Sequence, residues 1–435
     1  DFIGEASGSP GGMEASWVPR RATPDTVLEL SGLRPRWRLS ASAGMEAEEV
    51  EFSSLEDFDP SGIFSRLDRF SLLRDAREAA QEGRPDPRHA GRDPEPEGPE
   101  IPSSEGLGGG GLLEAILDVS EPSDPTPEPG SREELDAFVK EVVRPHLVRD
   151  DSDAKERVAG VDQAAGLQLA EVLHDPSFQQ LESVWRSLVL LLSRADTTGK
   201  VRIYLVHIPR EELERDLASS DDLARSKLYH LLSAPQLGRP GRRWALVTGA
   251  YQFELEPGAI ALMGRIARVA QAVDVPWISA VAPSSAAEGE DGAQTEADPW
   301  IDPPEEWHLF RGRSEAKWMG LTFPRFLLRE PYSEAGRRRK VPRFSEEISS
   351  PNHLLWGLGA FLPAILLARG FAAEGWGLQP RGQLELESMP VWNTPGGMGV
   401  LPTSVEVGLD PTEAHQMVER GVMPLVSFPE RAGVR

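Results

Sequence analysis

Glycines and histidines are the residues in this 435-residue chain whose types and spacing could do chemistry. Gly106–Gly111 fits G-x-G-x-x-G, a spacing that lets a backbone approach a phosphate, but an acidic proline-rich stretch precedes it where a strand is required. The Gly199-Lys200 pair lacks the hydroxyl residue that follows it in a P-loop. The histidines are scattered, and even the closest two, His207 and His230, lie too far apart to share a helical turn as a zinc motif demands. These patterns predict neither a cofactor nor a metal.

One further glycine motif keeps an enzyme among the alternatives. Ala245–Ala250 reads A-L-V-T-G-A and resembles the first strand of short-chain dehydrogenases. That family continues with glycines that admit a pyrophosphate at a helix N-terminus, whereas bulky side chains and a carboxylate follow here in Tyr251–Glu254. An α/β nucleotide-binding enzyme is therefore an alternative whose required context is missing. A Ser/His/Asp set brought together only by the fold also stays open.

Composition excludes several classes of function. The chain has 46 basic and 70 acidic residues and a net charge of −24, so its surface should repel a nucleic-acid backbone. It has no cysteine, which removes disulfides, cysteine nucleophiles and thiolate metal sites. The longest uncharged apolar run, Leu354–Ala368, is shorter than the ~20 residues that cross a bilayer, so we expect no membrane insertion. The start at Asp1 has neither a methionine nor a basic region, so we expect no signal peptide and a chain cut into mid-strand.

The chain divides by composition into three regions. Residues 1–82 are predicted to form a small α/β segment, and residues 83–110 a disordered linker rich in Pro, Gly, Asp and Glu. Residues 111–435 form a larger region of alternating strand and helix signals. In the first region we expect strands near Val27–Leu30, Arg36–Leu39 and Val50–Phe52. A helical stretch should follow there, with one apolar face made of Ile63, Leu67, Phe70 and Leu73.

The larger region has the pattern of an α/β protein with a mixed sheet and packed helices. Strands are predicted at Val201–Ile208, Arg243–Thr248 and Pro276–Ala282. A helix face lies between the last two strands and consists of Ile260, Met263, Ile266, Val269 and Val273. A long apolar helix is expected from Ser350 to Phe371, kinked at Pro363.

The most specific stretch is Leu173–Leu188, which reads L-H-D-P-S-F-Q-Q-L-E-S-V-W-R-S-L. Asp175 is predicted as a helix N-cap and Pro176 as the first helical residue. The apolar residues then recur at steps of three and four, which predicts one buried stripe made of Phe178, Leu181, Trp185 and Leu188.

This stretch resembles the signature of the large subunit of the type VI secretion contractile sheath. Three other stretches are similar to the same family: Trp318–Tyr332 with its P-R-x-L-x-R-x-P-Y, His353–Gly357 with L-W-G, and Phe371–Trp376 with F-A-x-x-G-W. Trp356 and Trp376 therefore join the expected core signature. The chain departs from the family at Ala250 and Ser333, and its large-subunit match stops short at Arg435.

The first region resembles the small subunit of the same sheath. Phe52–Pro60 is close to that family's F-x-S-x-x-D-F-x-P motif, and Phe70–Arg77 to its L-L-x-x-R helix. The chain therefore looks like a large subunit fused to a partial small subunit. In the family, strands from neighbouring subunits interlock, so a chain lacking both ends would have difficulty polymerising.

The resemblance implies a structural protomer of a cytoplasmic sheath, and no enzyme. Such a protomer polymerises around an inner tube and contracts to propel it; its partners are copies of itself, other sheath subunits, the tube and a baseplate. The alternatives are the nucleotide-binding enzyme and a plain acidic adaptor. The resemblance also points to a short helix that a hexameric AAA+ unfoldase would recognise, with Leu112, Leu113, Ile116 and Leu117 on one face. The alternative is that this helix packs on its own domain. Basic candidates for subunit contacts are Arg325, Arg329, Arg337, Arg338, Arg339 and Lys340. For the last four a solvated loop is the commoner explanation, and a contact with the acidic surface of a neighbouring copy is the alternative.

Overall fold

A computed structural model gives the fold of this protein. Its described residues are 2–4, 16–24, 27, 35–39, 47–81, 153–195, 201–219, 222–238, 244–282, 303–333, 343–378, 385–393, 403–428 and 432–435. The expected linker 83–110, most of the expected strand at Val27–Leu30 and the expected helix around Leu112–Leu117 lie outside these ranges.

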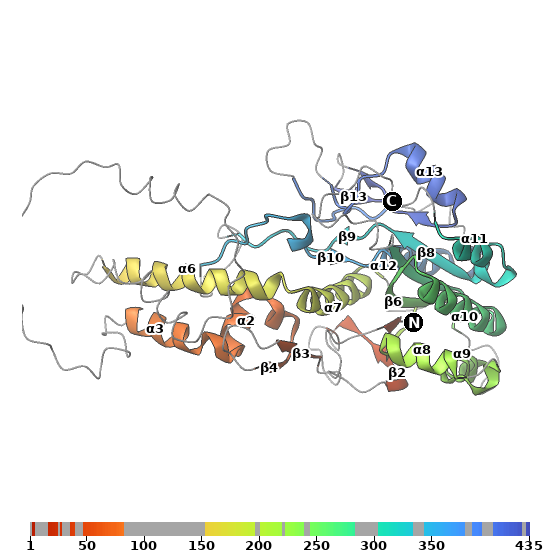
Figure 1. The fold of residues 1–435 in the computed structure, drawn as a ribbon, viewed down its shortest axis with the longest axis horizontal. Coiled ribbons are helices and arrows are strands. Elements are labelled where there is room, and N and C mark those ends of the chain that lie inside the picture. The colour runs from red at the N-terminus through yellow and green to blue at the C-terminus, as the bar shows by residue number, and fades with distance from the viewer. Residues whose placement is uncertain are drawn as a thin grey trace, which may run out of the picture. The chain divides into compact units, whose positions relative to one another are not determined.

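The described chain falls into two compact units that do not follow chain order. Unit 1 comprises Asp1–Arg38, Glu49–Arg66 and Gly166–Arg435, and unit 2 comprises Leu39–Glu48 and Leu67–Ala165. Unit 1 is built on a seven-stranded sheet with the order β11-β8-β7-β6-β1-β5-β2. Its strands β2, β6 and β8 are labelled in Figure 1. In that order the strands are Met423–Pro424, Met319–Phe323, Trp277–Ala282, Val247–Glu254, Phe2–Gly4, Ile203–His207 and Ser16–Ala22. All neighbouring strands are parallel except β2, which runs antiparallel to β5. The predicted α/β fold class is thereby confirmed.

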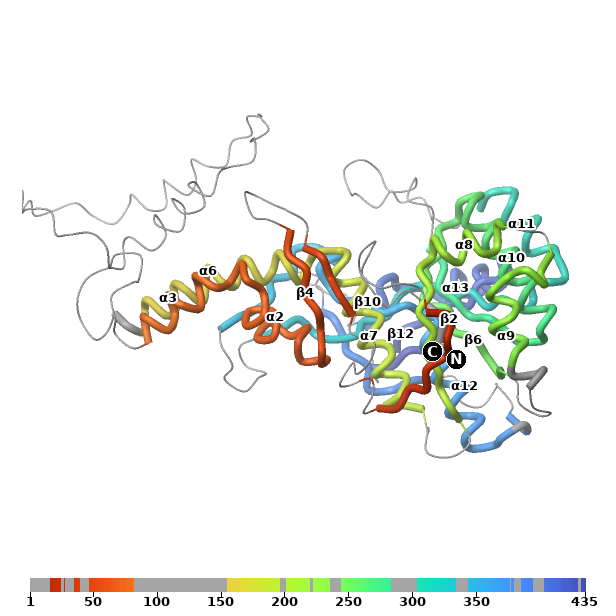
Figure 2. Tube along the Cα trace, turned by 90° about the horizontal axis from the view of Figure 1, so that it is seen from below, coloured from red at the N-terminus to blue at the C-terminus, as the bar shows by residue number. Residues whose placement is uncertain are grey.

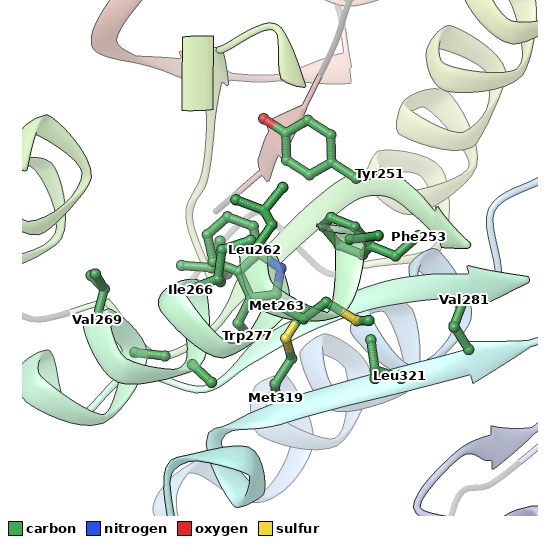
Figure 3. Close-up of a cluster of buried hydrophobic side chains, with 14 of the residues drawn as sticks. Tyr251, Phe253, Leu262, Met263, Ile266, Val269, Trp277, Val281, Met319 and Leu321 are labelled. Atoms are coloured by element: carbon green, nitrogen blue, oxygen red, sulfur yellow. The ribbon is translucent and has the colours of Figure 1, made fainter. Parts of the chain in front are cut away.

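One face of this sheet is covered by the helices that connect its strands. The connections β5 to β6, β6 to β7 and β7 to β8 all step in the same direction along the sheet, and right-handed crossovers then place their helices on one face. These helices are α8 (Arg210–Ala218), α9 (Lys227–Gly238), α10 (Pro257–Val273) and α11 (Glu305–Arg311). Their apolar sides form one core with β6, β7 and β8, centred on Trp277 and Met263 (Figure 3).

Two helices with small strand pairs complete unit 1. Helix α7 (Pro176–Arg194) contacts α12 (Phe361–Glu374), which also contacts β6. Helix α7 further contacts β10 (Trp356–Gly357), which pairs antiparallel with β9 (Phe326–Leu327). The remaining elements are helix α13 (Pro411–Glu419), the pair β12 (Ser427–Phe428) and β13 (Gly433–Val434), and helix α2 (Pro60–Arg66).

The N-terminal strands lie inside the sheet of the larger region. Strand β1 pairs with β5 on one side and with β6 on the other, and β2 covers the outer side of β5. Figure 2 follows the red N-terminal trace of β2 beside the green strands of unit 1. The strands β3 (Arg36–Leu39) and β4 (Glu48–Glu51) form a separate two-stranded sheet, close to where strands are predicted.

The described part of unit 2 contains α3 (Ser71–Gln81) and the first half of α6 (Asp153–Leu173). These helices are joined by Arg77, whose Nε donates to Asp162 Oδ1 at 2.7 Å; the two side chains are 12% and 3% exposed. Leu73 of α3 and Val161 and Ala165 of α6 are also buried.

Three predicted elements have different bounds in the structure. The helix expected from Ser350 begins only at Phe361, because Pro351–His353 is a 3-10 turn and Trp356–Gly357 is the strand that pairs with β9. Pro363 lies in the first turn of α12, where no backbone N–H is needed, so it does not have to kink the helix. The expected strand Arg243–Thr248 begins at Val247 and continues to Glu254.

The third difference concerns the apolar helical face expected from Ile63 to Leu73. The chain forms α2, then a 3-10 turn at Asp68–Phe70, then α3, so one helix becomes three pieces. The four apolar residues are nevertheless all buried.

None of the described helices is long and apolar enough to span a bilayer.

Candidate functional site around helix α7

Helix α7 begins where the sequence predicts it. Asp175 is the N-cap, and its Oδ1 accepts hydrogen bonds from the backbone N–H groups of Ser177 (2.9 Å) and Phe178 (3.0 Å). Pro176 occupies the first helical position, where its missing N–H costs nothing. This cap fixes the direction in which α7 leaves α6, and so fixes where the apolar stripe of α7 points.

The stripe of α7 packs against the N-terminal segment, which we define as the described parts of residues 2–38 and 49–66. The Phe178 ring meets Trp37 edge-on at 5.2 Å between centroids and lies 6.1 Å from Phe52 and 5.9 Å from Phe58. Phe52 and Phe58 stack on each other at 4.3 Å. Each of the four rings is at most 2% exposed. A closed aromatic cluster therefore joins two parts of the chain that are more than 100 residues apart.

A network of buried charges lies one turn further along α7. Glu182 is fully buried, and its Oε1 accepts hydrogen bonds from Arg186 Nε at 2.5 Å and from Arg329 Nε at 3.2 Å. Arg329 Nη1 donates in turn to Glu346 Oε2 at 2.6 Å, and the backbone N–H of Tyr332 donates to the same oxygen at 3.0 Å. The Arg329 guanidinium also lies 4.1 Å from the centre of the Tyr332 ring.

The N-terminal segment enters this network through Asp59. Its Oδ1 accepts a hydrogen bond from Arg186 Nη2 and another from the Tyr332 hydroxyl, each at 2.9 Å. The Trp37 indole adds a second polar link, because its Nε1 donates to Ser177 Oγ at 2.8 Å. We call Asp59, Glu182, Arg186, Arg329, Tyr332 and Glu346 the ion network.

The electrostatics of the network hold its members in fixed charge states. Burial alone would lower the pKa of Arg186 and of Arg329, but the charge of Glu182 raises both above the ordinary value. Burial would likewise raise the pKa of Glu346, yet hydrogen bonds from His174 and Arg329, together with the Arg329 charge, bring it down to about 2. A carboxylate held this firmly ionised is a poor general base, because catalysis needs a pKa near the working pH.

Two histidines border the network. The His174 and His353 rings stack at 4.0 Å between centroids, and His174 Nε2 lies 3.4 Å from Glu346 Oε1. Burial and the neighbouring His174 lower the pKa of His353. The sequence separates these histidines by 179 positions (353 − 174), so spacing alone did not predict that they meet. In the part of the chain that the structure describes, no group of three metal-binding side chains occurs.

The dehydrogenase-like glycine serves packing in this fold. A Cβ on Gly249 would lie 2.6 Å from the Trp277 ring and would also collide with Ser279 Oγ. Trp277 Nε1 donates to Ser279 Oγ, which donates to the carbonyl oxygen of Gly249. The following Tyr251 is buried and donates from its hydroxyl to the carbonyl oxygen of Ile208 at 2.7 Å. The glycine thus makes room for a tryptophan of the neighbouring strand.

The remaining predicted site residues are distributed as follows. Phe178, Leu181, Trp185, Leu188 and Trp356 are buried, while the side chain of Trp376 lies outside the described residues. Arg325 forms a bidentate pair with Glu406 and is one-third exposed. Arg329 is only 10% exposed and has its partners within its own chain, which leaves it little surface for a neighbouring copy. The residues outside the described ranges are Leu112, Leu113, Ile116, Leu117, Arg337, Arg338, Arg339 and Lys340.

Among the charged members of the site, only Arg329 was singled out from the sequence, as a candidate for subunit contacts, whereas Asp59, Glu182, Arg186 and Glu346 were missed. Glu182 and Arg186 are spaced i, i+4 and flank the apolar stripe, which usually indicates a solvated helix face. One signal could have identified some of these residues from the sequence. Arg329, Tyr332 and Asp59 all lie inside the stretches that resemble the sheath subunits.

Comparison with known proteins agrees with these observations. The model of the family described as VipB: EvpB/VC_A0108, tail sheath N-terminal domain, matches residues 155–432. The type VI secretion system sheath protein TssC1 of Pseudomonas aeruginosa is 28% identical over 286 residues, which are 62% of this chain and 57% of that protein. The chain therefore spans little more than half the length of this relative. The match to the family model begins after the N-terminal segment and lies within the larger region.

Proposed function

Because the chain belongs to the VipB tail-sheath family and is a type VI secretion sheath large subunit, we propose that it polymerises into a contractile sheath and acts there as a mechanical building block. The sheath wraps an inner tube and shortens in one stroke to propel it. Copies of the chain stack through one repeated heterologous interface, which generates an open helical array instead of a closed ring.

The observation that carries this proposal is that the motif residues of α7 make contacts within their own chain. The aromatic and charged side chains of α7 that lie in the motif resembling the sheath family are largely buried and contact other parts of the same chain. Carboxylates that are paired with guanidinium groups from distant segments stiffen a subunit. A subunit that transmits force between neighbours benefits from such cross-links between distant segments. The stroke would draw on the free-energy difference between two packings of the sheath and needs no cofactor.

The partners of the assembly belong to the same proposal. They are further copies of this chain, other sheath subunits, the inner-tube protein and a baseplate, all in the bacterial cytoplasm. Arg325 and the basic run Arg337–Lys340 are the contact candidates that this chain of net charge −24 offers to the acidic surface of a neighbour. We further propose that Leu112–Leu117 is the element through which a hexameric AAA+ unfoldase recycles contracted sheaths. Residues 1–82 are proposed as the small-subunit-like part of the protomer.

Assembly is tested by sedimentation of the protein expressed from its complete reading frame. We expect particles far larger than a 47.7 kDa monomer, and the fraction of sedimenting protein should rise with protein concentration. Titration with nicotinamide and adenine nucleotides serves as the parallel assay. Saturable nucleotide binding together with a monomer at every concentration and ionic strength would favour the enzyme over the sheath.

A further inference from the structure

The N-terminal segment completes the sheet of unit 1. Strand β5 has β1 on one side and β2 on the other, and both of these strands come from the N-terminal segment. Without them β5 would have no strand partner among the described strands, because β1 lies between β5 and β6 in the sheet. Unpaired strand edges leave backbone N–H and C=O groups without partners, a costly condition for a buried strand. Residues 166–435, which we call the body, therefore contain an interrupted sheet with a gap one strand wide.

The body also presents side chains that need the N-terminal segment. Phe178 is covered by Trp37, Phe52 and Phe58, and it would be left largely uncovered on the side where these rings now lie. Arg186 and Tyr332 both donate to Asp59, and each would lose that acceptor. A buried cation that loses a carboxylate partner is strongly destabilised.

These contacts are non-covalent, and the chain that connects them is long. Residues 82–152, 71 positions in all, separate the last residue of α3 from the first residue of α6. A connection of that length permits the segment to dock on its own body or on the body of another copy. The length of the connection therefore does not decide whether the segment docked on a body belongs to the same copy or to another one. In the structure, all the contacts described above are made within a single chain.

We propose that the body's binding surface for a small sheath subunit is filled in cis by the chain's own N-terminal segment, so that one polypeptide forms a complete protomer. A separate small subunit would find the strand gap, the aromatic cluster and the Arg186–Tyr332 pair already occupied. The designation of the segment as a small subunit rests on the proposed sheath function, whereas the docking in cis does not.

An engineered disulfide tests the proposal, because the chain contains no cysteine. Arg21 on β2 and Tyr204 on β5 are direct partners in an antiparallel pair, whose Cα atoms lie within the range that a disulfide spans. After mild oxidation, the double variant Arg21→Cys/Tyr204→Cys should form an intrachain disulfide in most molecules and migrate as a compact monomer on a non-reducing gel. The matched control is Arg21→Cys/Met423→Cys. It should stay reduced, because β11 and β2 are at opposite edges of the sheet, six strand spacings or about 29 Å apart.

A mixing experiment decides between cis and trans. The single variants Arg21→Cys and Tyr204→Cys, carrying different tags, are co-expressed and oxidised both before and after assembly. No covalent heterodimer is expected. Covalent dimers in this mixture would show that the segment comes from a second copy and would overturn the proposal. Absence of a disulfide in the double variant and in a second pair, Ala22→Cys/Ile203→Cys, would overturn the docking itself.

The outcome is independent of polymerisation. An intrachain disulfide in a protein that never sediments would leave docking in cis intact and contradict the sheath function. Polymers that contain interchain disulfides would support the sheath function and contradict docking in cis.

Discussion

Buried charges around Glu182 connect three parts of the chain that the sequence keeps far apart. Asp59 comes from the N-terminal segment, Glu182 and Arg186 from α7, and Arg329 from the loop after β9. These charges are removed from water wholly or in large part, from 0% exposure of the side chain at Glu182 to 24% at Asp59. The loss of hydration is compensated by the opposite charge beside each group and by hydrogen bonds. Removing one partner is therefore much more costly than the net stabilisation that the pair provides.

Arg329→Met tests this argument. The substitution keeps most of the side-chain volume but leaves Glu182 and Glu346 each without one guanidinium partner, so we expect a loss of about 3–5 kcal/mol in the free energy of unfolding. The measurement is urea denaturation followed by tryptophan fluorescence. Arg225→Met is the control; its side chain is 76% exposed, and the change should stay within about 0.5 kcal/mol. Equal effects of the two substitutions would contradict a buried network.

Glu346 gives the protein a defined acid sensitivity. Its pKa is about 2 in the folded protein against 4.5 for the free side chain, so the unfolded chain binds its proton first as the pH falls. The stability that Glu346 contributes is complete above about pH 4.5 and is lost as the pH falls toward 2. In that window Glu346→Gln should flatten the dependence of unfolding free energy on pH, by at most about 1.4 kcal/mol per pH unit. Stability curves at a series of pH values provide the measurement, and Glu347→Gln, at the exposed neighbouring position, should leave the slope unchanged.

Helix α7 illustrates what local sequence patterns can predict at the scale of an element. Its N-cap, its first residue and its apolar stripe all follow from residue types within one turn or two, and the structure agrees with each. The strands β5 and β7 were predicted to within two residues for the same reason, since each is a short apolar run. Local sequence patterns suffice to predict an element whose structure depends mainly on residues close to it in the sequence.

The elements that were predicted with wrong bounds depend on distant partners. Leu354–Gly357 is as apolar as the helix that follows it, and only its pairing with Phe326–Leu327 makes Trp356–Gly357 a strand. Strand β6 extends to Glu254 because β7 pairs with it over that length, after an irregularity between Thr248 and Gln252. Hydrophobic periodicity contains no information on such pairings.

Trp185→Ala tests whether the stripe of α7 is a core. Trp185 is fully buried, so the substitution should cost about 3–5 kcal/mol through lost transfer free energy and the cavity that remains. Differential scanning calorimetry should show a markedly lower Tm. Leu167→Ala on α6 is the control, since Leu167 is 64% exposed and its truncation should leave the Tm nearly unchanged. A Trp185→Ala protein that melts like the parent would show that the stripe is not packed.

At the scale of the whole molecule, unit 1 contains residues from the N-terminal part of the chain together with residues 166–435. The strands β1 and β2 and residue Asp59 come from the first 66 residues, while the helices and strands around them come from residues 166–435. The sequence indicated the family and the α/β class through its motifs. It did not indicate that β1 enters the sheet of the larger region, because this strand is short and its partners are more than 200 residues away.

Electron microscopy of the protein expressed from its complete reading frame tests the sheath function most directly. Negatively stained samples are examined over a range of protein concentration and ionic strength, with Arg329→Met as a destabilised comparison. The sheath function predicts helical tubes with a regular axial repeat, fewer of them in Arg329→Met, and a subunit density that accommodates unit 1. Dispersed monomers under every condition, from a protein that is folded by circular dichroism, would contradict it.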